Sequence, residues 1–394
     1  MTLPLSLYVH LPWCVQKCPY CDFNSHAGGT AEQRQRYLDA LLLDLAVEAE
    51  RAAGRKLGSI FLGGGTPSLF APHEIERLLT AVHARLEVAD DAEITMEANP
   101  GTVECGAPAG YRAAGINRIS FGGQSFNDRL LAKIGRIHAS GDIVRAVDDA
   151  RAAGLDNINI DLMHGLPGQS VAAALDDLRA AIELEPSHIS WYQLTLEPNT
   201  IFYARPPDDL PGEETLAEIQ DRGQALLAGH GYRQYEVSAY AREGRQCRHN
   251  LNYWSFGDYL AAGAGAHGKV SRAGTAYRYT KPANPLQYMT MLENGEVSAV
   301  AVPVAAADLV FEFMLNALRL TDGFSESVFC ETTGLLPTDL ENAMQAASAK
   351  GLVARTHDRG WRPTALGRRF LNDLQLEFLA AAPRERCDTA HPAA

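Results

Sequence analysis

The chain has 394 residues, of which 46% are hydrophobic, and its formal net charge is −13. This content of hydrophobic residues supports a folded core and excludes a mainly disordered chain, and the acidic balance disfavours a nucleic-acid binder. The start of the chain shows no basic region followed by an apolar run, so no signal peptide is expected. The most apolar late stretch, residues 299–315, contains Pro303, Asp308 and Glu312, which exclude a membrane span there.

Strand-like and helical patterns alternate through the first half of the chain. The expected strands are residues 5–10, 58–62, 93–97, 117–121, 157–163 and 188–194. The expected amphipathic helices are residues 37–53, 72–86, 142–153 and 171–184. This alternation predicts an α/β fold with a parallel sheet. Because a closed barrel of this kind needs eight units, six units predict an incomplete (β/α)6 barrel over residues 1–210.

The pattern changes after residue 197, where several prolines indicate a linker. A helix at 213–228, a strand at 232–238 and a glycine- and aromatic-rich region predict an α/β extension beside the barrel, over residues 211–300. Residues 301–380 read as helices followed by a hairpin of residues 352–355 and 360–363, which resembles a winged-helix module. Residues 381–394 are polar and are expected to be disordered.

Three cysteines, Cys14, Cys18 and Cys21, follow the first expected strand with the spacing C-x-x-x-C-x-x-C. Seven cysteines, an odd number with three crowded together, predict a metal centre in a reducing compartment, here the cytoplasm. Three thiolates can hold three irons of a [4Fe–4S] cluster and leave the fourth iron open. The spacing alone leaves two alternatives, a disulfide pair and a zinc site completed by His10 or His26.

Polar or glycine-rich residues stand at the ends of the other expected strands. They are Gly64, Gly65 and Thr66 after the second strand, Glu97 at the third, Gln124 after the fourth and Asp161 in the fifth. In parallel barrels the carboxyl ends of the strands meet at one mouth, where functional groups collect. This shared placement predicts a functional site at the mouth and favours a functional role for the three cysteines.

The cysteine spacing, with Tyr20 before the third cysteine, resembles the radical S-adenosylmethionine (SAM) family, and residues 64–67 resemble its glycine-rich SAM motif. Further segments resemble the oxygen-independent coproporphyrinogen oxidase family, namely residues 8–14, 97–101, 124–126, 135–138 and 161–168. Residues 21–26 and 249–254 resemble its haem-chaperone branch, the HemW type. The resemblance covers about residues 5–380.

The resemblance implies a [4Fe–4S] cluster on the three cysteines and SAM chelated by the open iron, where one electron cleaves it. It implies SAM contacts for Tyr8, Tyr20, Gly64, Gly65, Thr66, Glu97, Gln124, Arg136 and Asp161, of which Gln124, Arg136 and Asp161 correspond to contacts of a second SAM. The two glycines let the backbone approach the ligand closely. Haem is the implied cargo, and His249 is the candidate ligand.

Two departures distinguish the branches of this family. The coproporphyrinogen-oxidising branch has a further cysteine two residues beyond the third, where this chain has Phe23, and it has an extended N-terminal arm. Both favour a haem chaperone over a coproporphyrinogen III oxidase, and whether the chain is also an enzyme stays open. The expected partners are haem-accepting respiratory proteins and an electron donor for the cluster. This reading is compatible with association with a membrane surface through the haem-accepting protein. It is also compatible with a homodimer.

Overall fold

The computed structural model describes residues 3–101, 107–272, 274–296, 299–357 and 359–379. Internal contacts group the chain into two compact units, Met1–Pro303 and Val304–Ala394, and each is described by itself. The predicted domain boundaries near residues 210 and 300 stay a prediction. The predicted disordered tail, residues 381–394, lies outside the described residues.

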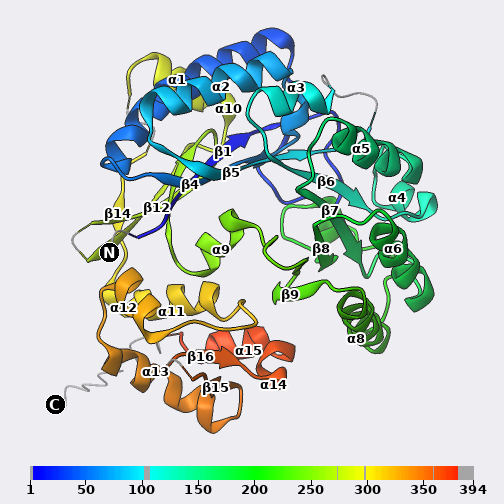
Figure 1. The fold of residues 1–394 in the computed structure, drawn as a ribbon, viewed down its shortest axis with the longest axis vertical. Helices are drawn as coiled ribbons and strands as arrows, with labels where there is room; N and C mark the ends of the chain where they lie inside the picture. Colours follow the sequence, from blue (N-terminus) through cyan, green and yellow to red (C-terminus); the bar gives the residue numbers. More distant parts are fainter. Residues whose placement is uncertain (1–2, 102–106, 273, 297–298, 358, 380–394) are drawn as a thin grey trace, which may run out of the picture. The chain divides into compact units, whose positions relative to one another are not determined.

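The first unit is built on one twelve-stranded sheet (Figure 1). Its middle consists of the six predicted strands, which are β1 (Leu5–Leu11), β4 (Leu57–Gly64), β5 (Val88–Ala98), β6 (Arg118–Gln124), β7 (Ile158–His164) and β8 (His188–Gln193). Each neighbouring pair runs parallel, which confirms the predicted α/β fold. Within the described residues the sheet order begins at β14 and ends at β9, so the sheet is open.

The sheet contains a seventh parallel strand that the sequence analysis missed. Strand β11 (Asp258–Ala262) pairs with β1 on the side away from β4. The antiparallel strands that continue the two edges are β12 (His267–Arg272), β13 (Thr275–Thr280) and β14 (Val302–Pro303) beyond β11, and β10 (Ala239–Ala241) and β9 (Arg233–Glu236) beyond β8. The six predicted strands are all present, and β11 adds a parallel strand that is followed by the antiparallel β12 and not by a helix. The β11 sequence DYLAA has no β-branched residue, so strand propensity gave little signal.

Most helices of this unit cover the outer face of the curved sheet (Figure 1). They are α1 (Ala31–Ala52), α2 (Pro72–Arg85), α3 (Pro108–Ala113), α4 (Asp128–Lys133), α5 (Ser140–Ala152), α6 (Val171–Glu183), α8 (Glu213–Gly229) and α10 (Pro285–Glu293). The single-turn helix α7 (Ile201–Ala204) follows β8, and its Phe202 amide donates to the Pro19 carbonyl. The short helix α9 (Arg248–Trp254) instead lies on the inner face, against β1, β4 and β11. No helix in the described ranges is both long and apolar enough to cross a bilayer.

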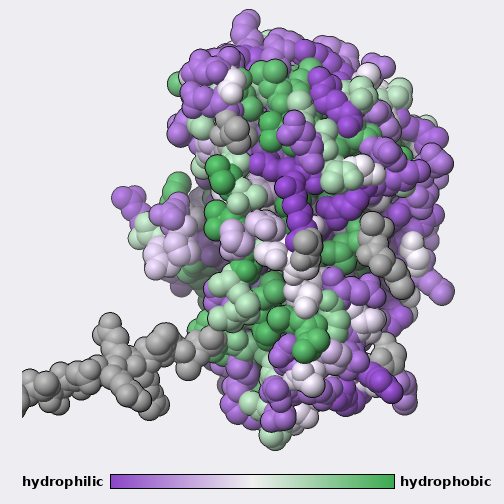
Figure 2. All heavy atoms as spheres, turned by 90° about the vertical axis from the view of Figure 1, so that its left-hand side faces the viewer, coloured by the Kyte–Doolittle hydropathy of each residue, from purple (hydrophilic) through white to green (hydrophobic). Residues whose placement is uncertain are grey.

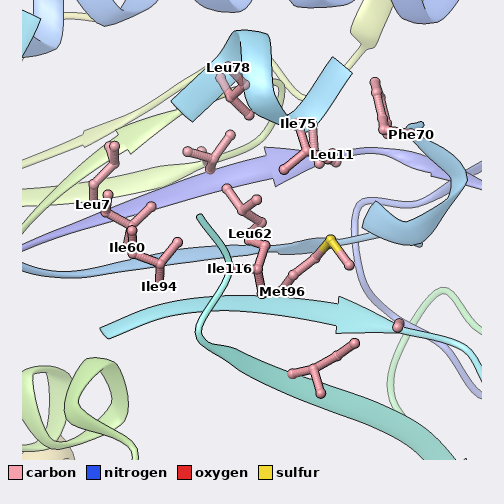
Figure 3. Packing of buried hydrophobic residues seen from close by; sticks show 14 of the residues in the cluster. Leu7, Leu11, Ile60, Leu62, Phe70, Ile75, Leu78, Ile94, Met96 and Ile116 are labelled. Carbon is pink, nitrogen blue, oxygen red and sulfur yellow. The ribbon is translucent and has the colours of Figure 1, made fainter. Parts of the chain in front are cut away.

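The hydrophobic core lies between the sheet and its outer helices (Figure 3). Leu7 and Leu11 of β1 and Leu62 of β4 are fully buried, together with Ile75 and Leu78 of α2. Side chains alternate along a strand, so the same strands present their other residues to the inner face. Burying each such side chain contributes about 1.5–3 kcal/mol. This packing fixes neighbouring strands relative to one another, so that their carboxyl ends lie at the same edge of the sheet.

A buried charge network joins α1 to the strands beyond β1. The Lys281 ammonium contacts the carboxylates of Asp44 (2.5 Å) and Glu48 (2.8 Å), and all three side chains are fully buried. Arg51 forms a second ion pair with Glu48, and the Tyr288 hydroxyl donates to Asp44 at 2.8 Å. Two acids therefore face two bases inside the protein. Removing either base would leave a carboxylate buried without its full counter-charge.

The second unit is helical with one hairpin. Its elements are α11 (Ala306–Ala317), α12 (Glu326–Thr333), α13 (Pro337–Ala349), β15 (Val353–Arg355), β16 (Trp361–Pro363), α14 (Ala365–Arg369) and α15 (Leu371–Leu376). The predicted order of helices followed by a hairpin is present, and the winged-helix assignment stays a prediction. Exposed hydrophobic residues of this unit include Leu336, Leu366 and Phe370. Figure 2 shows hydrophobic residues, in green, among hydrophilic ones on the face that it presents.

We expect Lys281→Met to lower the free energy of unfolding of the first unit by about 3–5 kcal/mol, because it leaves Asp44 and Glu48 buried without their ammonium partner. Lys350→Met is the matched control, since Lys350 forms an exposed ion pair with Glu377 and should cost less than about 1 kcal/mol. Denaturant unfolding measures both. Equal, small effects of the two substitutions would contradict the role given to the buried network.

Candidate functional site

A cavity of about 410 Å³ opens at the carboxyl ends of the parallel strands, within the size range of small-molecule sites. Every residue predicted for the site lines this cavity except Tyr8 and His249. The predicted residues on its walls are Cys14, Cys18, Tyr20, Cys21, Gly64, Gly65, Thr66, Glu97, Gln124, Arg136 and Asp161. We call it the mouth cavity. Its place at the strand ends agrees with the rule for parallel α/β barrels.

The three cysteines lie on residues 12–28, which we call the cluster loop. A two-stranded parallel sheet, β2 (Trp13–Cys14) with β3 (His26–Ala27), closes its base. The glycine motif at the end of β4 holds the loop and the end of β1 by two backbone hydrogen bonds. The Gly65 amide donates to the Leu11 carbonyl, and the Thr66 amide donates to the Trp13 carbonyl, both at 2.8 Å. Backbone hydrogen bonds therefore join the cysteine motif to the glycine motif.

Close packing requires glycine at positions 64 and 65. A Cβ at Gly65 would lie 2.5 Å from the Trp13 carbonyl oxygen and 2.7 Å from the Pro12 carbonyl carbon. Gly64 has φ of +112°, and a Cβ there would lie 2.4 Å from the His10 ring. The glycines were predicted from the sequence to allow the close approach of a ligand. The structure adds a second reason, because the motif must also approach the cluster loop.

Each cysteine sulfur has a polar side chain next to it. The pairs are Thr66–Cys14 at 3.6 Å, Arg136–Cys18 at 3.6 Å and Ser25–Cys21 at 3.7 Å. Burial raises the pKa of the free Cys14 and Cys21 thiols, and the adjacent hydroxyls oppose that shift. Hydrogen bonds to sulfur stabilise the thiolate, which is the form that binds iron. The donor set therefore fits an iron–sulfur cluster.

The structure does not favour the two alternative readings of the cysteines. All three are free, without a disulfide. The ring of His10 is engaged through Nε2 with the Asn24 carbonyl (2.8 Å) and through Nδ1 with the Tyr8 hydroxyl (3.1 Å). His26 Nε2 contacts Asn24 Oδ1 at 3.2 Å. Among the described residues, no three His, Cys, Asp or Glu side chains are placed to chelate a single metal ion. A cubane instead spreads its thiolates over separate irons.

Two partly buried carboxylates, Glu97 and Asp161, line the mouth cavity. Glu97 accepts a hydrogen bond from the Gly64 amide at 3.1 Å, and burial, reinforced by the nearby Asp161, raises its pKa to about 7. Asp161 accepts hydrogen bonds from the Ser120 hydroxyl (3.0 Å) and the Asn159 amide (2.7 Å), and burial raises its pKa too. These acids give the wall negative charge, which suits a cationic ligand such as a sulfonium.

The cavity lining also includes a cation and amide groups. The Arg136 Nη2 atom donates to Asn99 Oδ1 at 2.6 Å and to the Gly122 carbonyl at 2.7 Å. Gln124 has φ of +67°, unusual for a residue other than glycine, and accepts from the Tyr192 hydroxyl at 2.9 Å. Asn99 and Tyr192 also line the cavity but were not predicted as site residues. Both stand at strand ends, which was the available signal.

Tyr8 and His249 lie inside the barrel instead, on the inner face of the sheet. His249, on α9, is 2% exposed, its Nδ1 contacts the Ser59 hydroxyl at 3.1 Å, and its ring centre lies 5.1 Å from that of Phe61 and 6.3 Å from that of Tyr8. Burial lowers the pKa of His249 to about 3, so the ring is neutral. Its Nε2 is buried without a hydrogen-bond partner among the described residues.

A chain of buried hydrogen bonds leads from the mouth cavity to α9. Asn159, which donates to Asp161, contacts His188 Nδ1 through its Oδ1 at 2.6 Å. His188 Nε2 contacts the Tyr235 hydroxyl at 2.8 Å, and that hydroxyl accepts from the Cys247 amide at 3.3 Å. Burial lowers the pKa of His188, which favours its neutral form. Because Asn159 Oδ1 can only accept a hydrogen bond, the ring proton of His188 is on Nδ1. The start of α9 is thus joined to the cavity wall.

The fold and the site together define a radical SAM protein. The model of the Radical SAM superfamily matches residues 8–181, and that of the HemN C-terminal domain matches residues 304–370. A solved structure of coproporphyrinogen III oxidase (HemN) from Escherichia coli, described as a radical SAM enzyme, superposes with a TM-score of 0.79. It is 25% identical and covers 96% of this chain and 91% of its own.

Whole-chain relatives narrow the assignment. The haem chaperone HemW of Haemophilus influenzae is 49% identical over 381 residues, covering 95% of this chain and 98% of that protein. The haem chaperone HemW of Escherichia coli is 49% identical over 378 residues, covering 96% and 98%. The chain belongs to the HemW family, which confirms the family predicted from the sequence motifs.

We expect Gly65→Ala to reduce the iron bound after anaerobic reconstitution, because the added methyl group would push the cluster loop away from β4. Overpacking of this kind costs about 1–3 kcal/mol, so thermal stability should fall as well. Gly212→Ala is the control, since a Cβ at Gly212 meets no atom within 4 Å. Iron content and thermal stability equal to those of the unmodified protein would contradict the packing role of Gly65.

Proposed function

We propose that this protein is a haem chaperone, which binds haem as cargo and transfers it to haem proteins of respiration, and which carries a [4Fe–4S] cluster and binds SAM. The observation that carries the proposal is the 49% identity, over almost the whole chain, to proteins named haem chaperone HemW. The arrangement of the mouth cavity supports the cofactor part of the proposal. Because the cysteines are needed as thiolates, we place the protein in the reducing cytoplasm.

In this proposal Cys14, Cys18 and Cys21, which line the mouth cavity, would hold three irons of the cluster, and the fourth iron would have no ligand from the protein. When reduced, the cluster supplies the electron that cleaves the sulfonium bond of SAM. The chain's own groups position and shield these cofactors. Thr66 and Ser25 orient the sulfurs of Cys14 and Cys21 through the contacts described above, and the cluster loop keeps its cysteines at the strand ends.

The walls of the mouth cavity suggest how SAM is held. The backbone at Gly64 and Gly65 receives the methionine end next to the cysteines, and Glu97 accepts hydrogen bonds from the ribose hydroxyls. The negative wall formed by Glu97 and Asp161 attracts the sulfonium charge. Asp161, Gln124 and Arg136 already bond to neighbouring groups, and their contact with a second SAM stays a prediction.

Phe23 distinguishes this site from that of an oxidase. It lines the mouth cavity, and its side chain is 59% exposed beside the cluster cysteines. A phenyl ring cannot ligate iron or transfer a proton, whereas its flat apolar surface suits the packing of a porphyrin. The alternative function, oxidative decarboxylation of coproporphyrinogen III, draws support from the structural likeness to HemN. A phenylalanine at this position disfavours it.

His249 remains the candidate haem ligand. Its neutral ring contacts Ser59 through Nδ1 and leaves Nε2 as the available nitrogen, the arrangement that metal-ligating histidines use. Because the side chain is 2% exposed, ligation of haem requires α9 to move away from the inner face of the sheet. Haem-accepting proteins and an electron donor complete the proposed set of partners.

The functional claim predicts haem binding without coproporphyrinogen oxidation. Added haem should give a shifted Soret band with the purified protein, and His249→Ala should weaken or change that spectrum. His83→Ala on α2, an exposed histidine, is the matched control and should leave it unchanged. Anaerobic incubation of the reconstituted protein with SAM, reductant and coproporphyrinogen III should yield no protoporphyrinogen IX. Formation of that product with matching consumption of SAM would refute the chaperone proposal. A haem spectrum of His249→Ala equal to that of the unmodified protein would reject only the assignment of His249 as the haem ligand.

The raised pKa of Glu97, about 7, predicts a pH dependence of SAM binding. The carboxylate attracts the sulfonium and the protonated acid does not, so affinity should fall as the pH is lowered through 7. Between pH 8 and pH 6 the ionised fraction, and with it the affinity, falls roughly tenfold. The Glu97→Gln variant should bind SAM more weakly, and its affinity should not show this fall between pH 8 and pH 6. A wild-type affinity that is flat over this range would contradict the role of Glu97.

A further inference from the structure

Arg136 contacts the cluster loop through a fixed guanidinium. It follows α4, and its Nη1 atom lies 3.6 Å from Cys18 Sγ. Its Nη2 atom donates to Asn99 Oδ1 (2.6 Å) and to the Gly122 carbonyl (2.7 Å), so the ends of β5 and β6 hold the group in place. Because Nη2 makes two short hydrogen bonds, the guanidinium cannot turn away from Cys18 without losing them.

The charge of Arg136 sets it apart from the donors at the other two cysteines. Cys14 and Cys21 contact the neutral hydroxyls of Thr66 and Ser25. The Lys17 ammonium is exposed and bonds to the carbonyls of Phe23 and Ser25, where solvent screens it. Arg136 is partly buried, and its Nε is shielded from solvent without a hydrogen-bond partner in the described part of the chain. Solvent therefore screens its charge less than it screens that of the exposed Lys17.

We propose that Arg136 raises the reduction potential of the cluster by placing a permanent positive charge against the Cys18 thiolate. Reduction adds one electron, supplied by a low-potential one-electron donor, to a cluster and thiolate set that is already negative. No proton is needed, because the guanidinium is charged in both redox states. A fixed cation stabilises the more negative, reduced state, since charge near a cluster and hydrogen bonds to its sulfurs set its potential. This inference rests on the proposed cluster.

The test is the midpoint potential of the reconstituted, full-length protein without SAM, followed by the EPR signal of the reduced cluster. For Arg136→Gln we expect the reduction equilibrium to shift at least tenfold toward the oxidised state, which is about 59 mV for one electron. Arg136→Lys retains the charge and should recover most of this shift. Arg145→Gln, a nearby exposed arginine, is the control and should leave the potential unchanged.

The outcomes separate this inference from the proposed function. Failure of the unmodified protein to take up a cluster would reject the proposed function itself. Arg136→Gln protein with normal iron content and an unchanged potential would overturn the inference alone, as would a Lys variant that shifts as far as the Gln variant. A folded Gln variant without iron would overturn it in favour of a role in cluster assembly.

If the Gln variant does not fold, Asn99→Ala decides the question. That substitution removes one tether of the guanidinium and keeps its charge, so the potential should fall as Arg136 moves away from Cys18. An unchanged potential in this variant would contradict the inference. Iron content, measured on the same samples, shows that a complete cluster is being compared.

Discussion

The attachment of the cluster loop to distant parts of the sheet is the constraint on which the rest of the site depends. The Asn24 side-chain amide donates to the carbonyls of Ala264 (3.0 Å) and Ala283 (2.8 Å), more than two hundred residues away in the chain. The segment that carries Ala264 is itself fixed, because Asp44 accepts from the Gly263 amide at 3.2 Å. The buried ion pairs of α1 thus stabilise, through β11, the loop that carries the cysteines.

Much of the barrel and of the mouth cavity could be predicted from the sequence, because local signals specified them. Parallel strands buried on both faces read as short apolar runs, and their carboxyl ends must meet at one edge. Cys14, Thr66 and Glu97 could therefore be assigned to one site before any contact was known. The sequence motifs then supplied the family, which the identity to HemW proteins confirms.

The features that escaped prediction depend on contacts between remote segments. Strand β11 pairs with β1 although its own residues have weak strand propensity. The burial of His249 follows from α9 entering the inner face of the sheet, which no local pattern indicates. The contact of Arg136 with Cys18 spans 118 residues. A sequence pattern can identify such residues as polar members of a motif, but the tertiary fold determines their partners.

The central claim is that three strand-end cysteines leave one iron of a cluster open to SAM in the mouth cavity. The most direct measurement is electron–nuclear double resonance on the reduced, reconstituted protein with SAM labelled with ¹⁵N at its amine and ¹⁷O at its carboxylate. The account predicts hyperfine coupling of both labels to the cluster, because both groups bind the open iron. A fully loaded cluster that shows coupling to neither label would contradict it.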